Sequence, residues 1–165
     1  MIKLLVLDVD GTLTDGSIVY GSNGMEIKAF SSKDGLMLKN LHLLDISIVL
    51  ITGRESEAVA HRAADIGAAA FQGVLDKAGA LKTILLECGV ERENCAYIGD
   101  DLNDYSAMMM CGFRACPADA VAEVRAVCDY VSPCSGGHGA VRDICEFMLK
   151  REGRYDEYLA IFGVV

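Results

Sequence analysis

Short apolar runs alternate along this chain with segments in which apolar residues recur at the spacing of a helix. The runs occupy residues 4–7, 46–51, 69–71, 96–98, 113–116 and 130–131. Helices are predicted near residues 34–45, 55–66, 77–88, 102–111, 119–127 and 139–150. Near-continuous apolar strands separated by helices are typical of a parallel sheet covered on both faces. With right-handed crossovers, this order predicts a doubly wound α/β fold of the Rossmann type, in a single domain over residues 1–165.

One segment interrupts this alternation. Residues 17–20 and 25–28 are rich in strand-forming side chains and flank a Gly-Ser-Asn-Gly sequence. An Asn-Gly pair in this setting predicts a protruding β-hairpin over about residues 17–28. Because a two-stranded ribbon is marginally stable in water, we expect it to pack against a neighbouring subunit, with packing on its own domain as the alternative.

The composition narrows the class of protein. The chain has 165 residues, of which 52% are hydrophobic, and 24 acidic against 15 basic side chains give a formal net charge of −9. The apolar content excludes disorder, and the negative charge argues against a nucleic-acid partner. The longest apolar runs are far short of a membrane span, so the apolar excess predicts buried contacts between subunits.

The seven cysteines include no Cys-x-x-Cys pair and are odd in number. This pattern favours free thiols in a reducing compartment over a disulfide framework or a zinc site. The apolar stretch at the N-terminus is too short for a signal peptide. We therefore predict a cytoplasmic protein without a membrane partner.

Acidic residues follow the apolar runs where strands are predicted to end. Asp8 and Asp10 come after the first run, and Asp100 and Asp101 follow residues 96–98. Ligands of open α/β sheets bind outside these carboxyl ends. Converging carboxylates repel one another, and a hard cation such as Mg²⁺ relieves the repulsion while leaving room for a phosphate.

Two other polar residues occupy comparable places. Thr52 follows the second run, and Lys77 opens a helix after a short strand. Taken singly, the acidic pairs are explained by a turn or a helix N-cap, Thr52 by strand termination, and Lys77 by an exposed helix surface. Their joint occurrence at successive strand ends favours one Mg²⁺-dependent phosphate site.

The polar residues at the predicted strand ends belong to four short motifs that resemble those of a known family. Asp8-Val9-Asp10-Gly11-Thr12, Thr52, Lys77 and Gly99-Asp100-Asp101-Leu102-Asn103-Asp104 resemble the four motifs of the haloacid dehalogenase superfamily of phosphohydrolases. Almost the whole chain is also similar to its small capless branch, the 3-deoxy-D-manno-octulosonate 8-phosphate (KDO 8-phosphate) phosphatases. The closer similarity rests on residues 15–16, 23–24, 28–30, 33–35, 51–54, 72–73 and 136–142. It implies a fold without a cap domain and a homotetramer.

The resemblance implies hydrolysis through an aspartyl-phosphate. Asp8 would be the nucleophile, and Asp10 would protonate the leaving sugar oxygen and then activate the attacking water. Mg²⁺ would be held by Asp8, Asp100 and the backbone carbonyl of Asp10. Thr52 would hydrogen-bond a phosphoryl oxygen, and Lys77 would balance the charge on Asp8 and the phosphoryl group.

Two more acidic residues belong to the last motif. Asp101 and Asp104 are expected behind the reacting groups, where they would orient Lys77 or metal-bound water. The sequence leaves open whether Asp101 ligates the metal instead. His138 is expected to be a solvated loop histidine.

A sugar acid also needs cations that recognise its carboxylate. Arg54 directly follows the strand-end Thr-Gly pair, so it is predicted to reach the substrate. Arg62, two helical turns further on, is a second candidate, weighed evenly against an ordinary solvated helix residue. The other substrate-binding candidates implied by the resemblance are Lys33, Asp34, Gly35 and Gly53.

The leading hypothesis is a phosphatase of KDO 8-phosphate or a related 2-keto-3-deoxy sugar acid phosphate. Thr12 and Lys33 depart from residues common in sugar-acid members, which puts the exact sugar in doubt. A sialic acid or deaminated neuraminate 9-phosphate phosphatase is the alternative, although Arg54 favours the eight-carbon sugar. A non-catalytic phosphatase-like assembly domain is a further alternative, which the intact motif set argues against.

The C-terminal tail, residues 151–165, is rich in aromatic and aliphatic side chains. An exposed apolar tail is a liability unless it docks. The resemblance suggests docking toward an adjacent subunit's active site, so deletion of residues 153–165 is expected to change KM or turnover.

Overall fold

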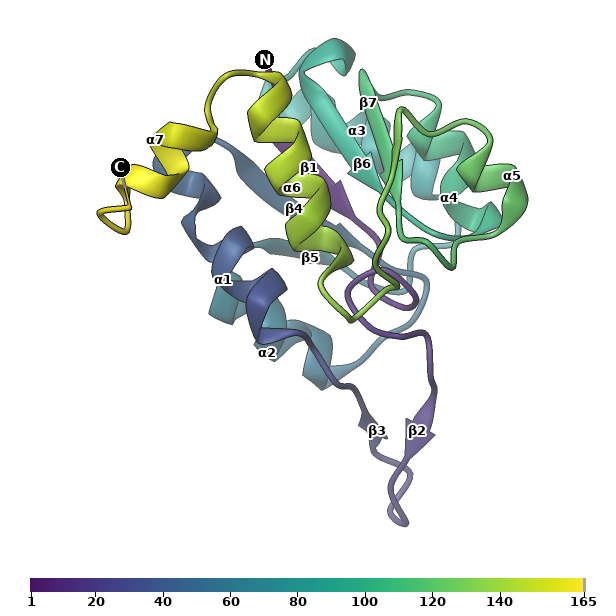
Figure 1. The fold of residues 1–165 in the computed structure, drawn as a ribbon. Coiled ribbons are helices and arrows are strands. Elements are labelled where there is room, and N and C mark those ends of the chain that lie inside the picture. The colour runs from purple at the N-terminus through teal and green to yellow at the C-terminus, as the bar shows by residue number, and fades with distance from the viewer. Residues whose placement is uncertain (165) are drawn as a thin grey trace.

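A six-stranded sheet forms the centre of the molecule, for which the computed structural model describes residues 1–164 (Figure 1). The strands are β1 (Leu4–Leu7), β4 (Ser47–Ile51), β5 (Ala69–Phe71), β6 (Cys95–Ile98), β7 (Phe113–Cys116) and β8 (Tyr130–Val131). They are parallel throughout and lie in the order β5-β4-β1-β6-β7-β8. The predicted doubly wound α/β fold is confirmed, and residues 1–164 contain no separate cap domain.

Helices cover both faces of the sheet, as Figure 1 shows. The covering helices are α1 (Ser32–Asn40), α2 (Glu57–Ile66) and α6 (Ala140–Arg151) on one face, and α3 (Lys77–Cys88), α4 (Leu102–Met108) and α5 (Ala122–Arg125) on the other. Side chains of a strand alternate between faces. Leu5 and Leu7 accordingly pack in the first core and Leu4 and Val6 in the second, and all four are fully buried.

Three predicted helices are shorter than expected. The segment predicted at 34–45 is α1 followed by the 3₁₀ helix η1 (Leu41–Leu44). The chain then turns at Asp45, whose φ of 54° is left-handed and ends the helix. The helices predicted at 102–111 and 119–127 are reduced to α4 and α5, while the short 3₁₀ helix η2 (Arg92–Asn94) precedes β6.

The predicted hairpin is present and protrudes beyond the sheet (Figure 1). Its strands, β2 (Val19–Tyr20) and β3 (Glu26–Ile27), are antiparallel and only two residues long. The turn is closed by the Gly21 N–H, which donates to the Met25 carbonyl at 2.8 Å. Its exposed apolar side chains are Ile18, Val19, Tyr20, Met25 and Ile27.

The C-terminal tail forms a helix that the sequence pattern did not predict. α7 (Tyr155–Ala160) packs against α6 and η1, far from the hairpin in Figure 1. Tyr158 is buried, and Arg154 Nη2 donates to the Leu44 carbonyl at 2.6 Å. The first part of the tail therefore packs on its own domain through Arg154 and Tyr158.

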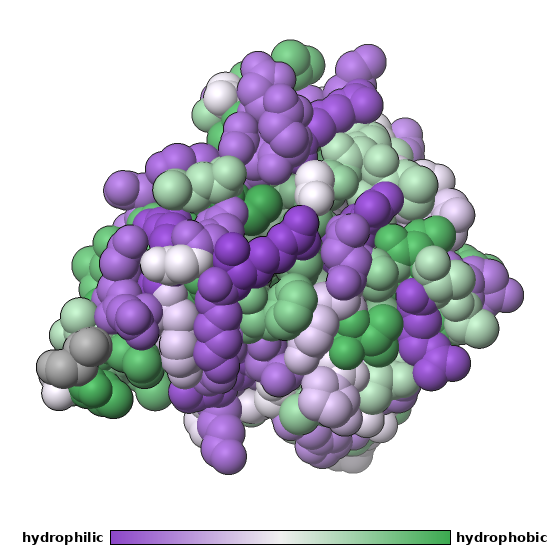
Figure 2. All heavy atoms as spheres, turned by 45° about the horizontal axis from the view of Figure 1, so that its top comes forward, coloured by the Kyte–Doolittle hydropathy of each residue, from purple (hydrophilic) through white to green (hydrophobic). Residues whose placement is uncertain are grey.

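All seven cysteines are free thiols, as predicted, and four of them are buried. Among residues 1–164, no helix is both long enough and apolar enough to span a membrane. On the face seen in Figure 2, polar side chains predominate and the apolar ones form small separate groups.

Candidate active site

A cavity of about 400 Å³ opens where β1, β4 and β6 end. It is lined by Asp8, Asp10, Gly11, Asp15, Gly16, Thr52, Gly53, Arg54, Asp100, Asp101, Asn103 and Asp119. The parallel register explains this convergence, because Leu7 pairs with both Leu50 and Ile98, so the residues after all three strands meet at one edge. Seven of the candidate site residues thus come together from three distant segments.

Lys77 lies beneath the cavity, in contact with Asp8. As the first residue of α3 it is nearly fully buried, and its ammonium group binds Asp8 Oδ1 at 2.5 Å and Asp104 Oδ1 at 2.7 Å. Burial lowers the pKa of Lys77, but the two carboxylates outweigh it and the pKa lies above its usual value. Lys77 is therefore a permanent cation behind Asp8.

The carboxylate of Asp8 lies in an unfavourable setting for a negative charge. Burial and then the charge of Asp104 raise its pKa well above the usual range, while Lys77 opposes them. The pKa of Asp100 is raised to about 6, mainly by burial, although a hydrogen bond from Thr12 Oγ1 at 3.0 Å lowers it. Burial is the main cause of both shifts, so a cation bound beside these carboxylates would favour their ionised forms.

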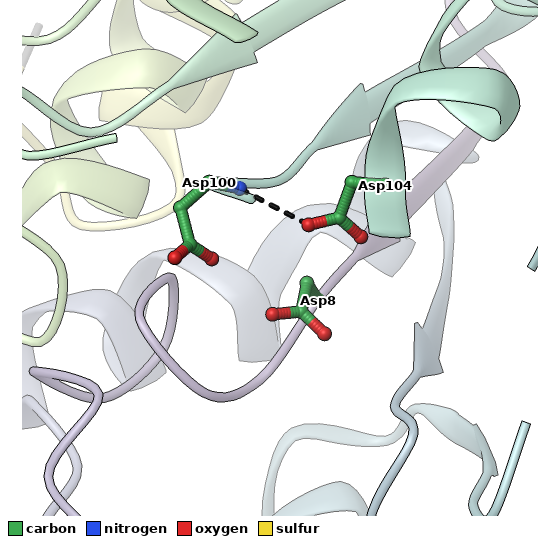
Figure 3. A group of neighbouring side chains, drawn as sticks. All are labelled: Asp8, Asp100 and Asp104. Carbon is green, nitrogen blue, oxygen red and sulfur yellow. Dashed lines mark hydrogen bonds between the residues drawn. The ribbon is translucent and has the colours of Figure 1, made fainter. Parts of the chain in front are cut away.

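Asp104 organises the cluster from behind. Its Oδ1 accepts hydrogen bonds from Lys77 Nζ and from the hydroxyl of Tyr97 at 2.9 Å. Its Oδ2 accepts from the backbone N–H groups of Asp100 at 3.1 Å and Asp101 at 3.3 Å. Figure 3 shows Asp8, Asp100 and Asp104 grouped together, with the Asp100–Asp104 bond dashed. Fully buried, Asp104 fixes Lys77 and the start of α4 at once.

The donor set fits a hard divalent cation. Asp8, Asp100 and Asp104 each offer a carboxylate oxygen, and these atoms lie within 4.8 Å of one another. Each oxygen of Asp104 already accepts two hydrogen bonds. Asp8 and Asp100 are therefore better placed to ligate a metal ion. Gly11, at φ +97°, leaves space for Asp100, since a Cβ there would lie 2.1 Å from Asp100 Oδ2. Asp101 is exposed and caps α4 through the Leu102 N–H at 2.7 Å.

A chain of ion pairs joins the hairpin to the cavity, and sequence reasoning missed it. Lys28 binds Asp10 and, at 2.6 Å, Glu26. Glu26 Oε2 accepts from Arg54 Nη2 at 2.7 Å, and the same nitrogen donates to the Tyr20 hydroxyl at 2.8 Å. The only signal was that residues 28–30 contribute to the family resemblance, without a role for Lys28.

Four of the substrate-binding candidates lie outside the cavity lining. Asp34 is fully buried, and its Oδ1 accepts from the Arg142 N–H at 2.8 Å, at the start of α6. Arg62 Nη2 donates to the Ser31 carbonyl at 2.7 Å, and its guanidinium packs against Gly35, where a Cβ would lie 2.3 Å from Nη2. Lys33 is exposed on α1. These contacts join α1 to α2 and α6.

The glycine-rich loop before α6 supports the loop that carries Asp10. A Cβ on Gly136 would lie 1.9 Å from the Gly11 carbonyl oxygen, so the two backbones are in direct contact. The Gly137 N–H donates to the Thr12 carbonyl at 3.2 Å. The role of Gly136 and Gly137 is thus close backbone packing.

Sequence comparisons place the chain among known phosphatases. A family model described as haloacid dehalogenase-like hydrolase matches residues 70–144. The 3-deoxy-D-manno-octulosonate 8-phosphate phosphatase KdsC of Escherichia coli (strain K12) is 41% identical over 157 residues, which cover 94% of this chain and 84% of that protein. The Haemophilus influenzae KdsC is 40% identical over 154 residues, covering 93% and 86%.

Solved structures agree. The crystal structure of 3-deoxy-D-manno-octulosonate 8-phosphate phosphatase from Moraxella catarrhalis, in complex with a magnesium ion, a phosphate ion and KDO, has a TM-score of 0.93 and 44% identity and covers 98% of this chain and 93% of that chain. The cobalt-bound Haemophilus influenzae enzyme has a TM-score of 0.89 and 39% identity, covering 93% and 91%.

Proposed function

The chain belongs to the 3-deoxy-D-manno-octulosonate 8-phosphate phosphatases, a family of haloacid dehalogenase-like hydrolases, and on this premise we propose that it hydrolyses KDO 8-phosphate with Mg²⁺. The observation that carries the proposal is the Asp8–Lys77–Asp104 cluster at the carboxyl end of β1, with Asp100 beside it. This arrangement supports the proposal because it offers a carboxylate at the cavity, a cation behind that carboxylate and oxygen ligands for a metal beside it.

The reaction proceeds in two displacements at phosphorus. An Asp8 carboxylate oxygen attacks the phosphorus, the bond to the sugar oxygen breaks, and Asp10 gives that oxygen its proton. A water molecule then attacks the aspartyl-phosphate, Asp10 takes the proton of this water, and phosphate leaves with Asp8 restored. Lys77 balances the negative charge on Asp8 throughout, while Thr52 donates a hydrogen bond to a phosphoryl oxygen.

The carboxylates of Asp8 and Asp100 and the backbone carbonyl of Asp10 are the groups that would hold Mg²⁺. When bound, the ion would supply positive charge that offsets the negative charge on Asp8 and the phosphate. Asp104 acts by holding Lys77, and Asp101 by capping α4. Removal of the ion with a chelator should therefore abolish turnover while leaving the fold intact.

Recognition of the sugar acid falls to the rim of the cavity. Arg54 lines it beside Gly53 and presents a planar guanidinium suited to a carboxylate. Lys33, exposed on α1, is a further surface cation. Asp34, Gly35 and Arg62 remain candidates for substrate binding, and their hydrogen bonds and packing also join α1 to α2 and α6.

We also propose that the hairpin mediates assembly, as a homotetramer. Five exposed apolar side chains on a two-stranded ribbon favour contact with another copy of the chain. Light scattering of the wild type and of a Val19→Asp, Ile27→Asp double variant tests this. A tetramer that the double variant reduces to smaller species supports the proposal, and an unchanged mass contradicts it.

The activity is tested with a panel of phosphate esters. Wild type with Mg²⁺ should hydrolyse KDO 8-phosphate in preference to deaminated neuraminate 9-phosphate and simple sugar phosphates. Asp8→Asn should fold normally and release no phosphate, because a neutral amide is a far weaker nucleophile than a carboxylate. A preference for the nine-carbon acid would refute the substrate, and an active Asp8→Asn enzyme would refute the nucleophile.

A further inference from the structure

A buried lysine on the hairpin contacts the proposed acid/base. Lys28 directly follows β3, yet only 1% of its side chain is exposed. Its ammonium group lies between two carboxylates and pairs with Asp10 Oδ1 and Glu26 Oε1. Lysine is almost never fully buried unless it is paired, so this placement calls for an explanation.

The Asp10 carboxylate depends on this contact. Asp10 stands on the loop after β1 and lines the cavity. Within residues 1–164, Lys28 is the one hydrogen-bond donor to its side chain. An aspartate on a loop rotates among staggered rotamers, and a charge-assisted hydrogen bond to Oδ1 selects one of them. Oδ2, which accepts none of the described hydrogen bonds, is then left for the reaction.

The same contact continues to the cation at the cavity rim. Glu26 binds Lys28 through Oε1 and accepts from Arg54 through Oε2, at 2.7 Å from Nη2 and 3.2 Å from Nε. Asp10 and Arg54, which come from different strand ends, are thus tied to Lys28 and Glu26, two residues apart on the same side of the hairpin turn. Lys28 itself does not line the cavity.

We propose that Lys28 is a positioning residue for Asp10, and that Glu26 extends this support to Arg54, so that the hairpin holds the acid/base and the substrate-reading cation in one geometry. This inference rests on the proposed phosphatase function. It assigns to Lys28 no contact with the reacting atoms.

Two substrates with different leaving groups can show whether Lys28 positions Asp10 or only supports the fold. Departure of a sugar alkoxide requires the proton that Asp10 supplies, whereas p-nitrophenolate leaves without one. A misplaced Asp10 therefore slows transfer of the phosphoryl group to Asp8 from a sugar phosphate much more than from p-nitrophenyl phosphate. Single-turnover measurements, with the enzyme in excess, isolate this first step.

The experiment compares Lys28→Met, which removes the charge and keeps much of the length, with Lys28→Arg, which keeps the charge. Lys82→Met, on the exposed surface of α3, is the matched control. Lys28→Met should slow release of KDO from KDO 8-phosphate by about tenfold to a hundredfold and release of p-nitrophenol by less than about threefold. Lys28→Arg should recover most of the rate, and Lys82→Met should match wild type.

Equal slowing of both substrates by Lys28→Met, or no slowing, would overturn the proposal. Circular dichroism shows whether Lys28→Met folds. If it does not, the double variant Lys28→Met with Glu26→Gln removes the repulsion between the unpaired carboxylates of Asp10 and Glu26. This double variant should give the same ratio of KDO release to p-nitrophenol release. If wild type prefers another alkyl phosphate, the substrate assignment fails, and that ester replaces KDO 8-phosphate in the comparison. A wild type inactive on every ester would overturn both proposals.

Discussion

Asp104 gives a quantitative test of how the active site is held together. Its two oxygens accept four hydrogen bonds in a fully buried position, from Lys77, Tyr97 and the backbone of Asp100 and Asp101. Asp104→Asn keeps the shape but replaces one accepting oxygen with an NH₂ group that only donates. In either orientation of the amide, two buried donors lose their acceptor.

The expected loss of stability follows from these contacts. Each buried donor left without a partner costs about 1–3 kcal/mol, and breaking a buried ion pair costs about 3–5 kcal/mol. The change also relieves the repulsion by which Asp104 raises the pKa of Asp8 and Asp100, and Lys77 keeps its bond to Asp8. The lost contacts outweigh this relief, leaving a net destabilisation of about 2–4 kcal/mol, or roughly 4–16 °C in Tm for a chain of this size.

Urea unfolding of the metal-free protein measures this difference. The matched control is Asp101→Asn, the same substitution three residues earlier at an exposed N-cap, where asparagine caps as well as aspartate. We expect this control to stay within about 0.5 kcal/mol of wild type. If Asp104→Asn unfolds within about 1 kcal/mol of Asp101→Asn, the buried hydrogen bonds do not stabilise the site as argued.

Three further outcomes are expected. The pKa of Asp100 in the folded protein is about 6, against a usual value of 3.8. The folded state therefore holds the proton of Asp100 more tightly than the unfolded state does. The stability that this provides is fully present below pH 3.8 and is lost as the pH rises through 6. Urea unfolding of the metal-free protein should show Asp100→Asn lacking this part of the pH slope, and an unchanged slope would contradict it. Gly136→Ala should lower turnover at least about tenfold, because the new methyl group displaces Gly11. The control Gly89→Ala, at φ +62° in open space, should lose only about 1–2 kcal/mol of stability. Equal turnover in both variants would argue against the contact between the two loops. Tyr158→Ala should lower the free energy of unfolding by about 3–5 kcal/mol without changing KM, because Tyr158 is buried. A changed KM at normal stability would instead favour a tail that contributes to another subunit's active site.

Local patterns in the sequence were enough to predict most of the sheet. The runs at 4–7, 69–71, 113–116 and 130–131 coincide with β1, β5, β7 and β8. β1 is apolar throughout because both of its faces are buried, whereas β5 and β8 lie at the edges of the sheet and are more exposed. The convergence of Asp8, Thr52 and Asp100 followed from the same reasoning, since parallel strands end at one edge. These predictions required only the order of elements and the position of each residue within its own element.

Features that depend on partners distant in sequence were missed. The hydrogen bond that Asp34 accepts from the backbone of α6, 108 positions away, was not anticipated. Lys28 lies 18 positions from Asp10, and no periodicity relates a hairpin lysine to a loop carboxylate. α7 is only six residues long, too short for a helical period to emerge above an apolar tail. Side-chain pairing between elements requires coordinates.

The proposed assembly through the hairpin would affect the chemistry, because Lys28 and Glu26 of the hairpin contact Asp10 and Arg54. Its strands are only two residues long, and a ribbon of this size is marginally stable alone. If a second copy packs on its exposed apolar side chains, as proposed, that contact would also steady Lys28 and, through it, Asp10. Dissociation by dilution, or by Val19→Asp with Ile27→Asp, should therefore reproduce the signature of Lys28→Met, with sugar release slowed more than p-nitrophenol release in single turnovers. If dissociated protein keeps the wild-type ratio of the two rates, the hairpin holds Asp10 without help from a second copy.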